Sequence, residues 1–164
     1  MGGMALCVQH WLAAADVDAG RIDDDQPCVR VRTASPAPNR PVDDFKDRTA
    51  LVTGGAQGFG LDIAKRFLKS GAKVIIWDID SKMIEKAQKD LDNSNLSSNI
   101  VDVSNFQEVE NCINEITKKT NIDILINNAG ITGPTASLWE YDVETWKKVV
   151  DINIMGTFNC CKTI

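Results

Sequence analysis

Residues 53–60 read Thr53-Gly54-Gly55-Ala56-Gln57-Gly58-Phe59-Gly60, and this stretch decides the fold of the chain. It overlaps the end of residues 49–53, a short apolar run that is typical of a strand buried on both faces. It leads into residues 58–70, where apolar side chains recur on one helical face and basic side chains on the other. A tight turn between a strand and a helix needs glycine where φ is positive. The stretch therefore predicts a strand–turn–helix unit.

The alternation of strand and helix continues after this unit. Ser81 is expected to cap the second helix, and Ser104 and Gln107 have the spacing of a capping box before the third. Further strands are expected at 73–78, 99–103 and 122–127, and further helices at 81–91, from 106 onward and from about 142 onward. Strands that alternate with helices predict an α/β fold, a Rossmann-type doubly wound parallel sheet.

The composition is that of an ordinary soluble domain. The chain has 164 residues, of which 43% are hydrophobic and 25% are charged, enough for one packed core. The net charge of −5 argues against a nucleic-acid partner, and no apolar run reaches the length of a membrane span. The five cysteines show no C-x-x-C spacing, so we expect no metal site, no disulfide framework and a cytoplasmic location. Cys112 and Cys160 or Cys161 are interpreted as small buried apolar residues.

The first 44 residues differ from the rest of the chain. They contain Asp23-Asp24-Asp25 and a turn-rich run from Ala34 to Pro41, and they show no helical or strand period. We interpret residues 1–44 as a disordered or artefactual extension, and residues 45–164 as the folded domain.

The glycine-rich turn also has the features of an anion-binding site. Gly58 and Gly60 would place no side chain between the backbone and a bound pyrophosphate. The N-terminus of the helix that follows offers free N–H groups and the positive end of its dipole to such an anion. The alternative is a tight turn without a ligand. The strand–turn–helix context favours the dinucleotide interpretation.

The spacing T-G-x-x-x-G-x-G resembles the short-chain dehydrogenase/reductase family. Four further matches follow in the order that the family has them. Asp78 ends the second strand, Asp102-Val103 ends the third, and Asn127-Asn128-Ala129-Gly130 ends the fourth. Asn153 lies within Asp151-Ile152-Asn153-Ile154-Met155-Gly156, which is similar to the segment that carries the family's catalytic asparagine. Together these matches cover the chain from Lys46 to its last residue.

The resemblance implies an oxidoreductase that transfers hydride between NAD(P) and an alcohol or carbonyl substrate, working as a homo-oligomer. Residues 127–135, with Trp146 and Cys160-Cys161, are most similar to the 3-oxoacyl-acyl-carrier-protein reductase-like branch. Asn153 is the implied catalytic residue. The implied cofactor-binding residues are Thr53, Gly54, Gln57, Gly58, Phe59, Gly60, Asp78, Ile79, Asp102, Val103, Asn128, Ala129 and Gly130, with sheet support as an alternative role for the last three.

Asp78 bears on the choice between the two nicotinamide cofactors. A carboxylate at this position accepts hydrogen bonds from the adenosine ribose hydroxyls of NAD and repels the 2′-phosphate of NADP. No arginine or lysine follows at Ile79 or Asp80 to neutralise it. We therefore expect NAD to be preferred. The alternative is that Asp78 only begins the turn after its strand.

The family's serine and Y-x-x-x-K motif do not occur in the chain after the fourth strand. The single tyrosine, Tyr141, has Thr145 four residues later and precedes Asn153, so we interpret it as a packing residue. We expect a sheet that stops after strand four and the long helix, leaving the edge at Ile122 and its neighbours unpaired. The chain by itself is then expected to be inactive. The alternative is a non-catalytic module that binds a dinucleotide or a partner.

Overall fold

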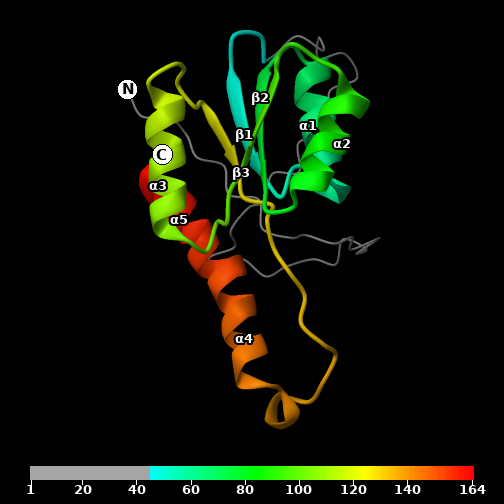
Figure 1. Ribbon diagram of the computed structural model, residues 1–164, viewed down its shortest axis with the longest axis vertical. Helices are drawn as coiled ribbons and strands as arrows, with labels where there is room; N and C mark the ends of the chain where they lie inside the picture. The colour runs from blue at the N-terminus through cyan, green and yellow to red at the C-terminus, as the bar shows by residue number, and fades with distance from the viewer. Residues whose placement is uncertain (1–44) are drawn as a thin grey trace, which may run out of the picture.

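The computed structural model describes residues 45–164, so the expectations for residues 1–44 lie outside the described residues. The described residues form one parallel four-stranded sheet in the order β3-β2-β1-β4 (Figure 1). The strands are β1 (Thr49–Thr53), β2 (Lys73–Asp78), β3 (Leu96–Ile100) and β4 (Ile124–Ile126). β2 and β3 lie on one side of β1, and β4 lies on the other. The direction in which successive strands join the sheet therefore reverses at β1. Such a switch point is where doubly wound sheets bind their ligands.

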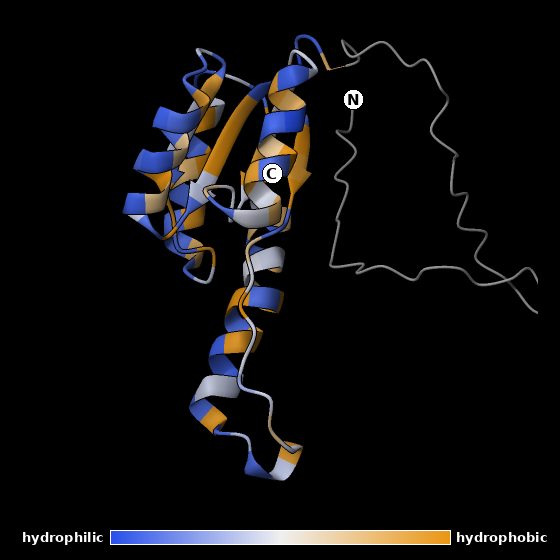
Figure 2. Ribbon diagram, turned by 90° about the vertical axis from the view of Figure 1, so that its right-hand side faces the viewer, coloured by the Kyte–Doolittle hydropathy of each residue, from blue (hydrophilic) through white to orange (hydrophobic). Residues whose placement is uncertain are grey.

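Helices cover both faces of the sheet, as the alternating pattern predicted. α1 (Gly58–Lys69) and α2 (Ser81–Leu91) pack on one face, and α3 (Phe106–Thr117) and α5 (Gly156–Thr163) pack on the other (Figure 1). The strands β1, β2 and β4 are mainly apolar, while the outer faces of the helices are hydrophilic (Figure 2). Each sheet face therefore has its own hydrophobic core, which confirms the doubly wound α/β fold.

The long helix predicted from about residue 142 is not one regular helix. It consists of α4 (Val143–Val150), a π-helical turn (Asp151–Met155) and α5. Asp142 caps it, with the carboxylate accepting a hydrogen bond from the Thr145 amide. α4 extends away from the sheet, and a loop containing the 3-10 turn Leu138–Glu140 leads into it (Figure 1). The apolar periodicity that predicted the helix does not distinguish a π turn from an α turn.

The predicted bounds of two strands were wrong. β3 ends at Ile100 and not at Val103, because only Leu96–Ile100 pairs in register with β2. The residues after it form a turn, in which the Asn105 amide donates to the Asp102 carbonyl. β4 covers only Ile124–Ile126 of the predicted 122–127. Apolar residues predicted these strands, whereas pairing depends on where the neighbouring backbone lies.

The predicted caps of α2 and α3 were also wrong, each by one residue. Asp80 caps α2, accepting hydrogen bonds from the Lys82 and Met83 amides. Asn105 caps α3, and its Oδ1 accepts from the Gln107 and Glu108 amides. The side-chain oxygens of Asp and Asn are about as effective at the N-cap position as the hydroxyl of serine. The predicted capping serine of α3 instead hydrogen bonds to a carboxylate of the preceding turn, described below.

Candidate functional site

A cleft of about 320 Å³ opens at the carboxyl ends of the strands. Its lining residues are Gly54, Gln57, Phe59, Asp78, Ile79, Val101, Asp102, Val103, Asn128, Ala129, Gly130, Ile131 and Ile152. These include all the predicted cofactor-binding residues except Thr53, Gly58 and Gly60. Sequence reasoning missed Val101, Ile131 and Ile152, although each is adjacent in the chain to a motif residue that it named. Asn153 itself is outside the lining set.

Thr53 and Asn128 tie the glycine-rich turn to the end of β4. The Thr53 hydroxyl oxygen accepts hydrogen bonds from the Asn128 amide (3.1 Å) and the Ala129 amide (3.0 Å). The Asn128 side chain donates in return to the carbonyls of Thr53 and Gly54, both at 3.0 Å. Both residues thus support the sheet in addition to any contact with a ligand. This is the alternative role considered for the asparagine.

Gly58 and Gly60 are required for different reasons. Gly58 has a φ of +54°, and a Cβ at this residue would find no atom within 4 Å. A Cβ on Gly60 would overlap with the Gly54 carbonyl oxygen and come within 2.5 Å of Asn128 Nδ2. Gly60 therefore allows the helix to approach the turn, and its predicted role of leaving room for an anion stays a prediction. The open space lies at Gly58.

Asp78 joins the end of β2 to the glycine-rich turn. Its Oδ2 accepts a hydrogen bond from the Ala56 amide at 3.2 Å, and its Oδ1 accepts one from the Asp80 amide at 3.1 Å. The residue is only 8% exposed, yet it lines the cleft. Each carboxylate oxygen has a second lone pair, so both can accept one more hydrogen bond. Asp78 therefore does more than begin a turn.

The loop between β3 and α3 forms another wall of the cleft. Asp102 Oδ1 accepts hydrogen bonds from the Ser104 amide (2.9 Å) and hydroxyl (2.7 Å). Its backbone amide donates to Glu108 Oε2 at 3.0 Å. Oδ2 of Asp102 has no partner among the described residues, so it can accept a hydrogen bond from a ligand. Val101 and Val103 are buried on either side of it.

Asn153 lies in the π-helical turn and faces the backbone that follows Gly130. Its carboxamide pairs with the amide and the carbonyl of Ile131. A Cβ on Gly130 would come within 3.2 Å of the Asn153 side-chain oxygen. The predicted catalytic residue thus holds the segment after β4 in place.

The sequence profile of the short chain dehydrogenase family matches residues 48–164. The chain belongs to this family. Among curated relatives, 2-dehydro-3-deoxy-L-rhamnonate dehydrogenase (NAD(+)) of Sphingomonas sp. is 34% identical over 121 residues, covering 73% of the chain and 48% of the relative. The 3-oxoacyl-(acyl-carrier-protein) reductase of Rickettsia typhi is 41% identical over 115 residues, covering 70% of the chain and 46% of the relative. The chain spans about half the length of these relatives.

Solved structures of the short-chain dehydrogenase family have the same fold over this part. A putative short-chain dehydrogenase from Novosphingobium aromaticivorans superposes with a TM-score of 0.70 at 30% identity, covering 73% of the chain and 45% of that structure. The Pseudomonas aeruginosa RhlG/NADP complex superposes with a TM-score of 0.68 at 31% identity, covering 76% of the chain and 49% of that structure. The family consists of NAD(P)-dependent oxidoreductases, and the chain is a member at that level.

The residues present in this short-chain dehydrogenase fit a dinucleotide. Gln57 precedes α1 as its N-cap residue but makes no side-chain capping hydrogen bond, whereas α2, α3 and α4 each have a capping Asp or Asn. The first amides of α1 are thus left for an anion, next to the open space at Gly58. Within residues 45–164, no group of His, Cys, Asp and Glu side chains could hold a metal ion, and no helix is long and apolar enough to cross a membrane.

Proposed function

We propose that the complete protein transfers hydride between NAD and an alcohol or carbonyl substrate, and that this chain supplies its cofactor site. The observation that carries the proposal is the Asp78 carboxylate, which two backbone amides hold at the edge of the cleft. A fixed negative charge there favours ribose hydroxyls over a 2′-phosphate. Ile79 and Asp80 add no positive charge. The name of the Sphingomonas relative also specifies NAD(+), while the Pseudomonas structure is an NADP complex.

Different residues of the cleft are suited to different chemical groups of the dinucleotide. The turn before α1 would bind the pyrophosphate, and Asp78 would accept hydrogen bonds from the adenosine ribose. Asp102 and Val103 would face the adenine, while Ala129 and Gly130 would pass close to the ribose. The bound nicotinamide ring supplies the hydride chemistry. Asn153 acts by fixing the backbone of Ile131 on that side of the cleft.

We also propose that the chain alone binds the cofactor without catalysing hydride transfer. Its single tyrosine, Tyr141, packs edge-to-face on Trp146 with ring centroids 5.5 Å apart, and the residue four positions later is Thr145. A tyrosine engaged in this packing, with threonine and not lysine four residues later, does not form the family's Y-x-x-x-K motif. A non-catalytic dinucleotide- or partner-binding module is therefore the second candidate function.

The test is a calorimetric titration of the purified chain with NAD and with NADP, followed by an assay of turnover with simple alcohols. We expect NAD to bind at least about tenfold more tightly than NADP, which corresponds to one charge contact, and we expect no turnover. Equal affinity for the two cofactors would contradict the NAD proposal. The absence of binding to either cofactor would overturn the assignment of the cleft, and turnover would exclude the non-catalytic module.

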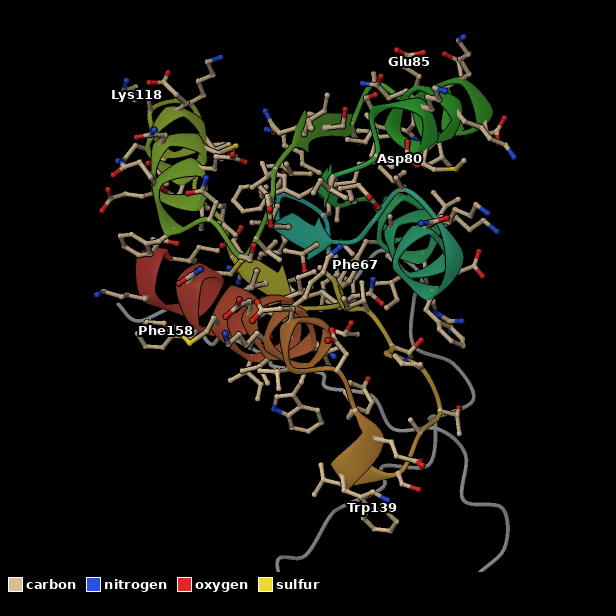
Figure 3. All side chains as sticks on the ribbon, turned by 60° about the horizontal axis from the view of Figure 1, so that its bottom comes forward. Phe67, Asp80, Glu85, Lys118, Trp139 and Phe158 are labelled. Carbon is tan, nitrogen blue, oxygen red and sulfur yellow. The ribbon has the colours of Figure 1, made fainter. Side chains whose placement is uncertain are left out.

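We propose that the complete protein forms a homo-oligomer through the long helix. Exposed apolar side chains lie along α4, the π turn and α5, and Trp139 and Phe158 point away from the sheet (Figure 3). From the 3-10 turn to the end of α5, the exposed large hydrophobic residues are Leu138, Trp139, Val143, Trp146, Ile154, Met155 and Phe158. Such a patch is typical of an interface. Light scattering on the chain and on Phe158→Ser should show an oligomer that the substitution weakens, and a monomeric wild type would contradict the proposal.

The proposed setting is the cytoplasm, with no nucleic-acid or membrane partner. The net charge of −5 argues against binding to nucleic-acid phosphates, and the five cysteines show no C-x-x-C spacing. Fractionation of cells that produce the protein, combined with a filter assay for DNA and RNA, tests this. Recovery in the membrane fraction or retention of nucleic acid would contradict it.

A further inference from the structure

Asn159 is a buried polar residue of α5 that lies behind the loop between β3 and α3. It is 4% exposed. Its side-chain amide nitrogen donates hydrogen bonds to the Val103 carbonyl at 2.9 Å and the Ser104 carbonyl at 3.3 Å. One nitrogen thus satisfies two carbonyls of a loop that is 55 residues or more away in sequence. Removing it would leave both carbonyls without these partners in a buried place.

The helix touches the same loop at a second point. A Cβ on Gly156 would come within 2.7 Å of the Val103 side chain, so the helix backbone lies directly against this valine. One turn further along, Cys160 packs in the same core cluster as Val101 and Val103. The contact of Asn159 is therefore part of a close-packed interface between α5 and the loop. Such packing resists even a small displacement of the loop relative to the helix.

The other side of this loop faces the cleft. Val101, Asp102 and Val103 all line it. Asp102 has one carboxylate oxygen committed to Ser104 and the other without a partner among the described residues. An ionised carboxylate only accepts hydrogen bonds. The donor on the edge of an adenine is its 6-amino group, and the corresponding group of hypoxanthine is a carbonyl.

We propose that Asn159 is a positioning residue for recognition of the purine. It acts through the Val103 and Ser104 backbone, which it holds against α5, and so sets where the Asp102 carboxylate stands in the cleft. Glu108 holds the same loop from α3, accepting hydrogen bonds from the Asp102 amide and from the Asn105 side chain. The inference rests on the proposed function, because it assumes that the cleft binds a dinucleotide.

The test compares NAD with nicotinamide hypoxanthine dinucleotide, which has a 6-oxo group in place of the 6-amino group. Calorimetry on the full chain gives the ratio of the two affinities. We expect wild type to favour NAD by about tenfold, the size of one hydrogen bond to a charged group. In Asn159→Leu, which keeps the branching and the number of side-chain heavy atoms but donates nothing, NAD affinity should fall about tenfold and the ratio should approach 1. Loss of packing alone would weaken both ligands equally.

Two further variants separate positioning from general stability. Asn159→His can place a ring N–H where the asparagine donates, so it should restore much of the ratio. Thr163→Val removes a hydroxyl that donates within α5, to the Asn159 and Cys160 carbonyls, and should leave the ratio unchanged. If Asn159→Leu does not fold, Asn159→Ser takes its place: water in its cavity can satisfy the two carbonyls and keep the domain folded, but it does not tie them directly to α5.

The outcomes distinguish this inference from the proposed function. An unchanged ratio in a folded Asn159→Leu or Asn159→Ser overturns the role of Asn159 while leaving NAD binding intact. Equal binding of both dinucleotides by wild type also overturns it, because the cleft then does not distinguish the 6-amino group from the 6-oxo group. A wild type that binds neither dinucleotide overturns the proposed function itself.

Discussion

Asn153 and Ile131 form a closed pair of hydrogen bonds. The asparagine side-chain oxygen accepts from the Ile131 amide at 2.9 Å, and its nitrogen donates to the Ile131 carbonyl at 3.0 Å. Asn153 lies in the π-helical turn between α4 and α5, while Ile131 follows the motif after β4. π turns inside α-helices are frequently found at functional sites. The pair fixes the segment after β4, which lines the cleft, to the long helix.

Replacing Asn153 with leucine should destabilise the domain by about 0.5–1.5 kcal/mol, because both backbone groups of the exposed Ile131 lose their protein partner and turn to water. Urea unfolding monitored by circular dichroism measures the change. Asn114→Leu, an exposed position on α3, provides the matched control. Equal stability of the Asn153 and Asn114 variants would show that the pair contributes nothing.

The two glycines of the turn should respond differently to alanine. Gly60→Ala should cost several kcal/mol, about 3 or more, or prevent folding, because its Cβ would overlap with the Gly54 carbonyl. Gly58→Ala has open space but a φ of +54°, so it should cost only about 1–2 kcal/mol. The Gly58 variant should nevertheless bind NAD more weakly, since its methyl group enters the open space before α1 that is proposed to hold the pyrophosphate. Thermal unfolding and calorimetry together separate the two effects, and similar losses of stability in both variants would contradict this account.

Replacing Asp78 with serine should weaken NAD about tenfold and strengthen NADP several-fold, because the negative charge next to the ribose is removed. The variant should also lose about 1–3 kcal/mol of stability, since the Ala56 and Asp80 amides lose a charged acceptor. Calorimetric titration of both cofactors is the measurement. Asp90→Asn, an exposed position of α2, changes the net charge by the same amount and should leave the preference intact.

Asp123 should make the free energy of unfolding of the domain depend on pH in the acid range. The Thr49 amide, and then the Arg48 guanidinium, hold the pKa of this carboxyl below its usual range. A group whose pKa is lowered by folding stabilises the folded state above its unfolded pKa of about 3.9, and that contribution disappears as the pH falls through the folded pKa. Asp123→Asn should therefore be less stable than wild type at neutral pH, and the difference should shrink as the pH falls below the unfolded pKa of the carboxyl. A difference that does not change with pH would contradict this cause.

The adjacent cysteines Cys160 and Cys161 should differ in reactivity. Burial, and then the neighbouring Cys161, raises the pKa of the Cys160 thiol to about 12. Cys160 is fully buried, while Cys161 is exposed and accepts a hydrogen bond from the Asn127 side chain. Iodoacetamide at about pH 8 should modify Cys161 and leave Cys160 unreacted until the chain is unfolded, since the thiolate is the reactive form. Tandem mass spectrometry distinguishes the two sites, and equal labelling of the folded chain would show that Cys160 is accessible.

Much of the site could be predicted from the sequence because its signals are local. The glycine-rich stretch before α1 and the Asp78 at the end of β2 are of residue types typical of tight turns and strand ends. The carboxyl ends of parallel strands meet at one edge of the sheet, so these residues lie close together. These signals were enough to bring most of the predicted cofactor residues to one cleft. They also placed Tyr141 correctly as a packing residue, since no lysine follows it at the required spacing.

The errors in the prediction have physical reasons as well. β3 was placed three residues too late because its apolar residues continue past the last backbone pair with β2. The close approach of Gly60 to Gly54 and Asn128 was not predicted, because this contact cannot be read from spacing. Asn159 was not singled out, since its partners Val103 and Ser104 lie in a different element.

The sequence by itself determined the order of strands and helices, the glycine-rich turn and the family, because residue type and spacing act over a few neighbouring positions. The tertiary structure alone decided which groups face each other: Asp78 with the Ala56 amide, Asn153 with Ile131, and Asn159 with the loop after β3. These contacts join residues more than twenty positions apart. They depend on strand register and helix packing, which are fixed only when the two cores close on the sheet.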